Sequence, residues 1–364
     1  MNDSTTQTDA GSAQGDVASA PSRGFASRLV RKGAAGRSVG LIIALLVLVA
    51  VGWITAGENF MSADNMLVIL RLASVIGVVA IGVTFVITAG GIDLSVGSVL
   101  GLSSVVATLG AIQTAASGFW PLMVFVAIAV GVLAGVVNGL VIAYGNVVAF
   151  MATLAMLVAA RGAAELISQR KTLIVTNQGF LDFFRSDLLG ISWVVWIFAV
   201  VAVLGWFLLN RTTFGRRTVA IGGNATAARL AGINVKRHTT YLYMLAGATA
   251  GIAGIMLLSR TTAGTSTHGQ LYELDAIAAV VVGGTLLIGG RGTIGGTVLG
   301  VLLFATLTNV FIQNNLSTSV QLVAKGVIIV VAVLLQQRFA NREGAAARAR
   351  HVEGPSSASS GAAN

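Results

Sequence analysis

The stretch LSVGSVLGLSSVVATLGAIQTAASGFWPLMVFVAIAVGVLAGVVNGLVIAYGNVVAFMATLAMLVAA, residues 94–160, contains 67 residues and no charged side chain. An α-helix needs about 20 apolar residues to cross the hydrocarbon core of a bilayer. The stretch therefore has room for two complete spans and most of a third, divided near Ser117 and near Gly145. A transmembrane β-barrel would instead show alternating segments of about ten residues. The sequence predicts an all-α, polytopic membrane helix bundle.

The composition of the whole chain agrees with this prediction. Of its 364 residues, 55% are hydrophobic and 10% are charged, whereas about a quarter of the residues in a soluble domain are charged. Cysteine is absent, which excludes disulfides and thiolate metal sites. The three histidines are far apart in the sequence. We therefore expect no metal site and no cofactor.

The distribution of Lys and Arg predicts the orientation in the membrane. Five lie before residue 38, six between 210 and 239, one at 291 and four after 337, while the loops of the opposite side hold four. Basic residues accumulate in cytoplasmic loops. Both termini are thus expected in the cytoplasm, and the net charge of +10 indicates topology rather than nucleic-acid binding. The apolar segments predict about ten spans, roughly 39–57, 66–88, 96–116, 119–143, 147–168, 190–209, 240–258, 275–289, 294–312 and 319–337.

Two tails flank the membrane domain. Residues 1–37 are rich in Ser, Thr, Ala, Gly and Gln and then become basic, and residues 339–364 are again rich in Ala, Ser, Gly and Arg. Such composition is typical of disordered segments. We expect a membrane domain over 38–338 between two disordered cytoplasmic tails.

The segment GGIDLSVGS, residues 90–98, places one carboxylate, Asp93, in an apolar region. The carboxylate could accept backbone N–H groups where the next helix begins, because Asp and Ser are favoured there. Alternatively, this glycine-flanked break could face the translocation pathway, where irregular backbone is tolerated at membrane depth. Both interpretations stay open. The candidate residues are Gly90, Gly91, Asp93, Ser95, Gly97 and Ser98.

The long loop 210–239 contains six basic residues, no acid and one compact helix signal. Asn224 is a good N-cap, residues 225–231 are alanine-rich, and Gly232 suits the left-handed residue after a helix. A short helix of alanines would allow a partner protein to approach closely, with Arg229 available for acidic groups. An ordinary basic loop that touches anionic lipid is the alternative.

A second glycine-rich segment resembles the first. Shifting the chain by 199 residues aligns GGIDLSVGSVLGL (90–102) with GGRGTIGGTVLGV (289–301), through Gly289, Gly290, Gly295 and Gly296. Transporters are often built from internal repeats with broken helices, although a general bias toward glycine would also explain the match. The match of 290–295 to the dinucleotide-binding pattern lacks the acid that the pattern requires about 20 residues on. We therefore expect no nucleotide site on this chain.

Charged residues within or beside the predicted spans form three further candidates. Glu273 and Asp275 open a short span and suit a helix N-terminus, with contact to a substrate or a docking partner as the alternative. Arg161 and Glu165 are four residues apart and predict mutual pairing. Lys325 is the last ionisable residue within a predicted span.

Four motifs together resemble the membrane permease subunit of ribose-type sugar importers of the ATP-binding cassette class. They are AIGVTFVITAGGIDLSVGSVLGL (80–102), AIGGNATAARLAGINV (220–235), YELDAIAAVVVGGT (272–285) and GGRGTIGGT (289–297). Leu286 and Leu287 stand where a small residue and another apolar one are common, and Gln270-Leu271 stands where a glycine commonly precedes the tyrosine. These departures concern substrate identity more than mechanism.

The resemblance implies a permease of the bacterial inner membrane that is not itself an enzyme. It implies as partners two cytoplasmic ATP-binding cassette domains, which hydrolyse ATP, a periplasmic sugar-binding protein and a second permease subunit. It further implies that the 210–239 loop carries a coupling helix, with Gly222, Gly223, Asn224, Ala228, Arg229 and Gly232 as its residues. The implied substrate is a monosaccharide or a related polyol. The alternatives are a permease of the branched-chain amino acid type, a secondary transporter, and a structural or channel-like membrane protein.

Overall fold

The computed structural model describes residues 23–328 and 330, with side chains from residue 39 onward. Most of this part of the chain is helical. The long helices are α1 (Arg23–Ala56), α2 (Ala63–Thr88), α5 (Pro121–Ala143), α6 (Ala149–Ser168), α8 (Trp193–Arg211), α11 (Val235–Thr261) and α13 (Ile294–Gln313). The shorter helices are η1 (Gly57–Met61), α3 (Val96–Ala107), α4 (Gly110–Ala115), α7 (Gln178–Arg185), α9 (Thr213–Gly223), α10 (Ala225–Leu230) and α12 (Tyr272–Val282). A further helix runs over Thr318–Ile328.

Seven of the described helices are long and apolar enough to cross a membrane. The polytopic all-α bundle predicted from the sequence is therefore confirmed. The other three predicted spans, 96–116, 275–289 and 319–337, coincide with shorter described helices, the last of which is described only in part. The count of ten and the cytoplasmic termini stay predictions. Helix α1 begins within the predicted N-terminal tail, while residues 1–22 and the tail 339–364 lie outside the described residues.

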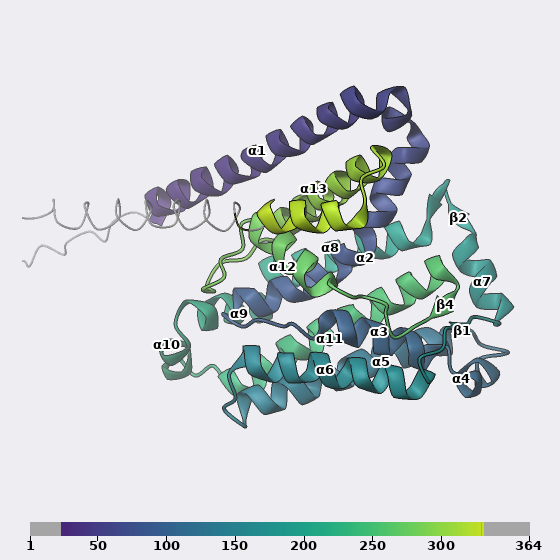
Figure 1. The fold of residues 1–364 in the computed structure, drawn as a ribbon. Helices are drawn as coiled ribbons and strands as arrows, with labels where there is room; N and C mark the ends of the chain where they lie inside the picture. The colour runs from purple at the N-terminus through teal and green to yellow at the C-terminus, as the bar shows by residue number, and fades with distance from the viewer. Residues whose placement is uncertain (1–22, 329, 331–364) are drawn as a thin grey trace, which may run out of the picture. The chain divides into compact units, whose positions relative to one another are not determined.

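Each described strand is two residues long, and the strands form two pairs between loops. Strand β1 (Leu173–Ile174) pairs with β4 (Ala263–Gly264), and β2 (Asp187–Leu188) pairs with β3 (Ile191–Ser192), both antiparallel. Strands β1 and β4 lie at one end of the helices, and α9 and α10 lie at the other (Figure 1). We call these the strand end and the loop end.

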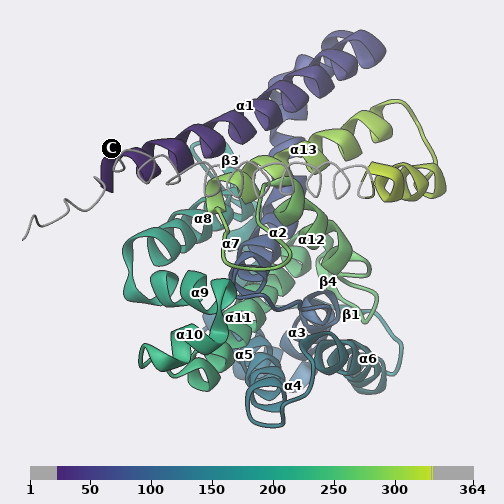
Figure 2. The same cartoon turned by 90° about the vertical axis from the view of Figure 1, so that its left-hand side faces the viewer.

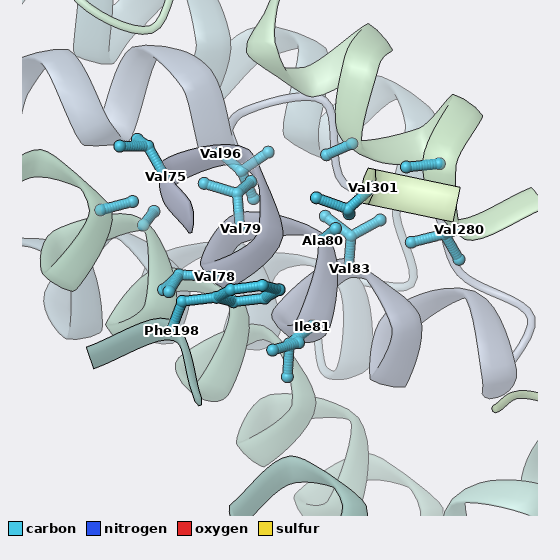
Figure 3. Close-up of a cluster of buried hydrophobic side chains, with 14 of the residues drawn as sticks. Val75, Val78, Val79, Ala80, Ile81, Val83, Val96, Phe198, Val280 and Val301 are labelled. Carbon is cyan, nitrogen blue, oxygen red and sulfur yellow. The ribbon is translucent and has the colours of Figure 1, made fainter. Parts of the chain in front are cut away.

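Helix α2 forms the centre of the bundle. It packs against α11, α13, α8 and α12, and 17 of its 26 residues are buried. Figure 3 shows how its valines meet Phe198 of α8 and Val301 of α13. Two polar contacts join α2 to α13: the amides of Asn65 and Asn309 exchange hydrogen bonds of 3.1 and 2.8 Å, and the hydroxyls of Thr84 and Thr297 lie 2.8 Å apart. Interhelical hydrogen bonds of this kind are typical of membrane bundles.

Helices α5 and α11 pack closely along their length, side by side in both ribbon views (Figure 2). Gly131 of α5 faces the backbone of Gly247 of α11, and Gly139 faces Thr240, with no space for a Cβ at either glycine. Small residues allow two backbones to approach where lipid supplies no hydrophobic drive. The glycines of these two spans thus serve helix packing.

Candidate functional site

The segment after α2 is a break inside the bundle that a few side chains hold in place. Oδ1 of Asp93 accepts hydrogen bonds from the Ser95 amide at 2.9 Å and from the Ser95 hydroxyl at 2.6 Å. The amide of Asn138 donates to the Ser95 hydroxyl at 2.9 Å. Asp93, Ser95 and Asn138 are all at least 98% buried. The carboxylate therefore organises the start of α3, as the first of the two sequence interpretations requires.

The carbonyl of Ile92 accepts two further hydrogen bonds in this break. Its donors are the hydroxyls of Tyr243 on α11, at 3.4 Å, and of Thr153 on α6, at 3.3 Å. A Cβ on Gly91 would come within 2.6 Å of the Tyr243 hydroxyl, which is why a glycine stands there. The sequence pattern did not identify Tyr243, Thr153 or Asn138, because each lies in a regular helix more than 40 residues from the break.

A second break precedes α12. The chain returns from the strand end along α3: a Cβ on Gly264 would meet the Ser104 carbonyl at 2.6 Å, and a Cβ on Gly101 would meet the His268 carbonyl at 2.7 Å. Gly269 then contacts the backbone of Gly97 in the first turn of α3. The segment 264–269 therefore runs antiparallel to α3, and α12 begins where α3 begins.

Helices α3 and α12 are each too short to cross a bilayer alone. With 12 and 11 residues, they are about 18 and 16 Å long at 1.5 Å per residue, against a hydrocarbon core of about 30 Å. Their N-termini meet inside the bundle, and the two helices lead away toward opposite ends. Discontinuous helices whose N-termini meet at membrane depth are typical of transporter pathways.

Arg161 and Glu273 lie where these two helices meet. The Arg161 guanidinium donates to the carbonyls of Ser266 and His268, so it holds the returning segment against α3. Glu165 forms an ion pair with Arg170 at 2.9 Å. The predicted pairing of Arg161 with Glu165 is therefore wrong, because the carbonyls of a distant segment take the guanidinium. Glu273 is 9% exposed and its Oε2 atom has no hydrogen-bond partner.

Asp275, the second predicted acid of α12, pairs with Lys325. Its Oδ2 atom lies 2.9 Å from the Lys325 ammonium, and both side chains are about 15% exposed. The ion pair joins α12 to the helix Thr318–Ile328. The two acids that the sequence grouped at one helix start thus have different surroundings.

Five glycines from three distant parts of the chain meet at the loop end. A Cβ on Gly289 would meet the amide nitrogen of Gly90 at 2.8 Å and the carbonyl of Gly222 at 2.9 Å, and a Cβ on Gly290 would meet Gly223 at 3.1 Å. The Gly290 amide donates to the carbonyl of Thr88, the last residue of α2, at 2.8 Å. We call Gly90, Gly222, Gly223, Gly289 and Gly290 the glycine junction.

The glycine junction connects α9 to both glycine-rich segments predicted from the sequence. Gly90, Gly289 and Gly290 have φ of +84°, +86° and +78°, which residues with a Cβ rarely adopt. Gly222 packs on the backbone of Thr88 and Gly290 with no space for a Cβ. The end of α9 therefore contacts both the end of α2 and the segment before α13.

The predicted short helix in the basic loop is confirmed as α10. The Asn224 side chain accepts a hydrogen bond from the Ala227 amide at 2.9 Å, and Gly232 has a φ of +82°. Ala228 is only 5% exposed, so it packs inward rather than toward a partner. Leu230, which the sequence pattern did not single out, is 85% exposed. It lies next to Arg229 on the outer surface of α10.

Three further residues predicted from the sequence are Ser98, Gly295 and Gly296. Ser98 donates to the Ser95 carbonyl at 2.9 Å inside the first turn of α3. Gly296 packs against the Gly283 backbone, whereas Gly295 has open space around its Cα. Among the described residues there is no group of three His, Asp or Glu side chains that could hold a metal ion.

Comparison with known proteins identifies the family of this chain. A family model described as the branched-chain amino acid transport system / permease component matches residues 65–333. The chain belongs to this permease family. The family match covers both breaks, the glycine junction and α10.

Curated members with considerable sequence identity are sugar permeases. The chain is 42% identical over 305 residues to the ribose import permease RbsC of Bacillus subtilis, covering 83% of this chain and 93% of the relative. It is 38% identical over 297 residues to RbsC of Haemophilus influenzae, covering 80% and 90%. The L-arabinose ABC transporter permease AraH of Azospirillum brasilense is 34% identical over 330 residues, covering 90% and 93%.

No solved structure matches the chain significantly. The curated permeases and the seven apolar helices together identify a multi-pass protein of the bacterial inner membrane. The predicted ribose-type permease family is thereby confirmed.

Proposed function

We propose that this chain is the membrane permease subunit of an ATP-driven importer for a monosaccharide, with pentoses as the substrate class. The observation that carries the proposal is identity of 34 to 42% to permeases named for ribose and L-arabinose over at least 80% of this chain. The chain supplies the pathway, and ATP hydrolysis takes place on a separate subunit. A periplasmic sugar-binding protein delivers the substrate, and a second permease subunit completes the pathway.

In this proposal, α9 and α10 receive the movement of the ATPase. Leu230 and Arg229 on the outer surface of α10 contact the ATPase, and the glycine junction transmits the displacement to α2 and to the segment before α13. The two breaks that begin α3 and α12 then shift as rigid bodies, which changes access to the pathway. Rigid-body motion at an interface is a common form of such switching.

Uptake by the reconstituted importer tests the proposal. The permease is placed in proteoliposomes with the ATPase and the substrate-binding protein encoded beside its gene, and uptake of labelled D-ribose, D-xylose, L-arabinose and L-leucine is measured. We expect uptake of one pentose that requires ATP and the binding protein. ATP-dependent uptake of leucine alone would favour the branched-chain amino acid alternative. Pentose uptake without ATP, driven by an ion gradient, would favour a secondary transporter.

A further inference from the structure

A pocket of about 430 Å³ lies at the loop end between the first turns of α9 and α11. Its lining includes Thr213, Phe214 and Arg217 from α9 and Arg237, His238 and Tyr241 from α11. Its lining contains no acidic residue, and the whole loop 210–239 contains none. The pocket therefore carries two positive charges with no negative charge beside them.

Two helix N-termini reinforce this charge. Helices α9 and α11 both begin at the pocket, and their capping side chains, Thr212 and Asn234, each accept one first-turn amide. The other first-turn N–H groups have no partner within their helix, and the helix macrodipole places partial positive charge there. Two guanidinium groups and two helix N-termini around one pocket favour a phosphate-like anion.

The walls of the pocket are held in place without a ligand. The His238 ring bonds to the Thr218 hydroxyl at 2.9 Å and contacts the Phe214 ring with centroids 4.5 Å apart. Nε of Arg237 donates to the Tyr241 hydroxyl at 2.6 Å. Neither Arg217 nor Arg237 takes part in an ion pair between described residues. Both guanidinium groups are therefore available to an anion.

The surroundings place this pocket at the level of the lipid headgroups. Cations stack on aromatic rings at the loop ends of three spans: Arg211 on Trp206 of α8, Lys236 on Tyr144 after α5 and Arg237 on Tyr241 of α11, at 5.4 to 5.5 Å. Aromatic and basic side chains mark the membrane interface. Arg237 and Tyr241 belong both to this belt and to the pocket, and Tyr241 lies about 9 Å along α11 from its first residue.

We propose that the pocket binds the phosphate group of an anionic phospholipid from the cytoplasmic leaflet. Arg217 and Arg237 contact the phosphate oxygens, and the exposed faces of Tyr241 and Phe214 contact the adjoining part of the lipid. Because the pocket lies between α9 and α11, a bound lipid fixes the position of α9 relative to its neighbouring span. The proposal depends on the membrane topology and not on the identity of the transported sugar.

Lipid binding to the full-length permease tests this proposal. The detergent-purified protein is titrated with phosphatidylglycerol or phosphatidylcholine, and bound lipids are counted by native mass spectrometry. The variants are Arg217→Gln, Arg237→Gln and the double variant. A basic residue near an anionic lipid surface contributes about 1 kcal/mol, which corresponds to about 5-fold weaker binding of phosphatidylglycerol per substitution and about 25-fold for the pair.

The matched control is the double variant Arg216→Gln/Arg229→Gln. Both residues lie on the same loop and carry the same charge, but neither lines the pocket or belongs to the cation–aromatic belt. We expect this control to keep the wild-type affinity for phosphatidylglycerol, and Arg217→Lys to keep most of it. Equal weakening by the control and the pocket variants would overturn the proposal, because it would indicate a general effect of net charge.

Two further arms distinguish other occupants. Competition by inorganic phosphate at millimolar concentration would indicate a soluble anion instead of a lipid. Unchanged phosphatidylglycerol binding in the pocket variants, combined with weaker association with the ATPase, would assign the pocket to the ATPase. Either result would overturn the lipid assignment and leave the proposed transport function intact.

Discussion

At the scale of single residues, the buried carboxylate of Asp93 acts on its own chain. Oδ1 of Asp93 accepts hydrogen bonds from the amide and the hydroxyl of Ser95, and the Ser95 hydroxyl in turn accepts one from the Asn138 amide. A polar group that is buried without a hydrogen-bond partner lowers stability. Here the buried side chains of Asp93, Ser95 and Asn138 form hydrogen bonds with one another instead of with water. Asp93 is thus a positioning residue for the first turn of α3.

Substitution of Asp93 separates its role as an acceptor from its charge. Asp93→Asn keeps one acceptor oxygen, so we expect uptake to fall by about fivefold, equivalent to one hydrogen bond of about 1 kcal/mol. Asp93→Ala removes the acceptor, and we expect a larger loss. The measurement is ATP-dependent uptake in proteoliposomes, with permease assembly checked by size-exclusion chromatography. Equal and complete loss in both variants would show that the negative charge itself is required.

The glycine pair of residues 222 and 223 offers a second test at this scale. A Cβ on Gly222 would overlap the backbone of Thr88 and Gly290, while Gly223 has open space around it. Overpacking typically costs 1 to 3 kcal/mol, and a backbone neighbour cannot move aside like a flexible side chain. We expect Gly222→Ala to lower the midpoint of thermal unfolding and to reduce substrate-stimulated ATP hydrolysis by the complex.

Gly223→Ala is the matched control for stability, and we expect its unfolding midpoint to equal that of the wild type. Substrate-stimulated hydrolysis at the wild-type level in Gly222→Ala would remove the glycine junction from the coupling path. Gly296→Ala and its control Gly295→Ala form a second pair of this kind, because only Gly296 lacks space for a Cβ.

At the scale of elements, the ends of α10 are set by local capping residues, whereas the side chains on its outer surface are set by how the helix packs. Its cap, Asn224, and its C-terminal Gly232 are local features. Which of its side chains face outward depends on how the helix rests on α9 and α11. Ala228 faces inward and Leu230 outward.

Substitutions on α10 test its contact with the ATPase. We expect Leu230→Glu to weaken association with the ATPase by at least tenfold, because the change removes an exposed apolar side chain and adds an acid at the docking surface. Asn224→Ala removes the cap, which costs about 1 kcal/mol, and should reduce substrate-stimulated ATP hydrolysis, whereas Asn224→Asp should retain it. Association is measured by co-purification and by titration. Wild-type association of Leu230→Glu would place the docking surface elsewhere.

At the scale of the whole permease domain, contacts between distant segments hold the broken helices together. Arg161 joins α6 to the segment before α12, and Asp275 joins α12 to the helix Thr318–Ile328. Each contact links segments at least 50 residues apart in the sequence. The loss of one contact therefore affects how elements are arranged and not whether they form.

The Asp275–Lys325 ion pair is tested by charge exchange. Removing one partner of a buried pair leaves an unpaired charge that destabilises strongly, so we expect Lys325→Met and Asp275→Asn each to lower the unfolding midpoint. The exchanged variant Asp275→Lys/Lys325→Asp should recover at least half of the loss, as expected for coupled residues. Thermal unfolding in detergent measures both effects. A double variant whose loss equals the sum of the single losses would show that the pair is not coupled.

The sequence by itself determined the fold class, most of the spans, the positions of the two glycine-rich segments 90–98 and 289–297, and the capped helix α10. These features depend on the length of apolar runs, on charge and on residues within a few positions of one another. Only the tertiary structure decided that glycines of three distant segments meet, that Arg161 donates to the segment before α12 instead of pairing with Glu165, and that Leu230 rather than Ala228 faces outward. Contacts between segments that are distant in the sequence arise from how helices pack, and a single sequence carries no local pattern for them.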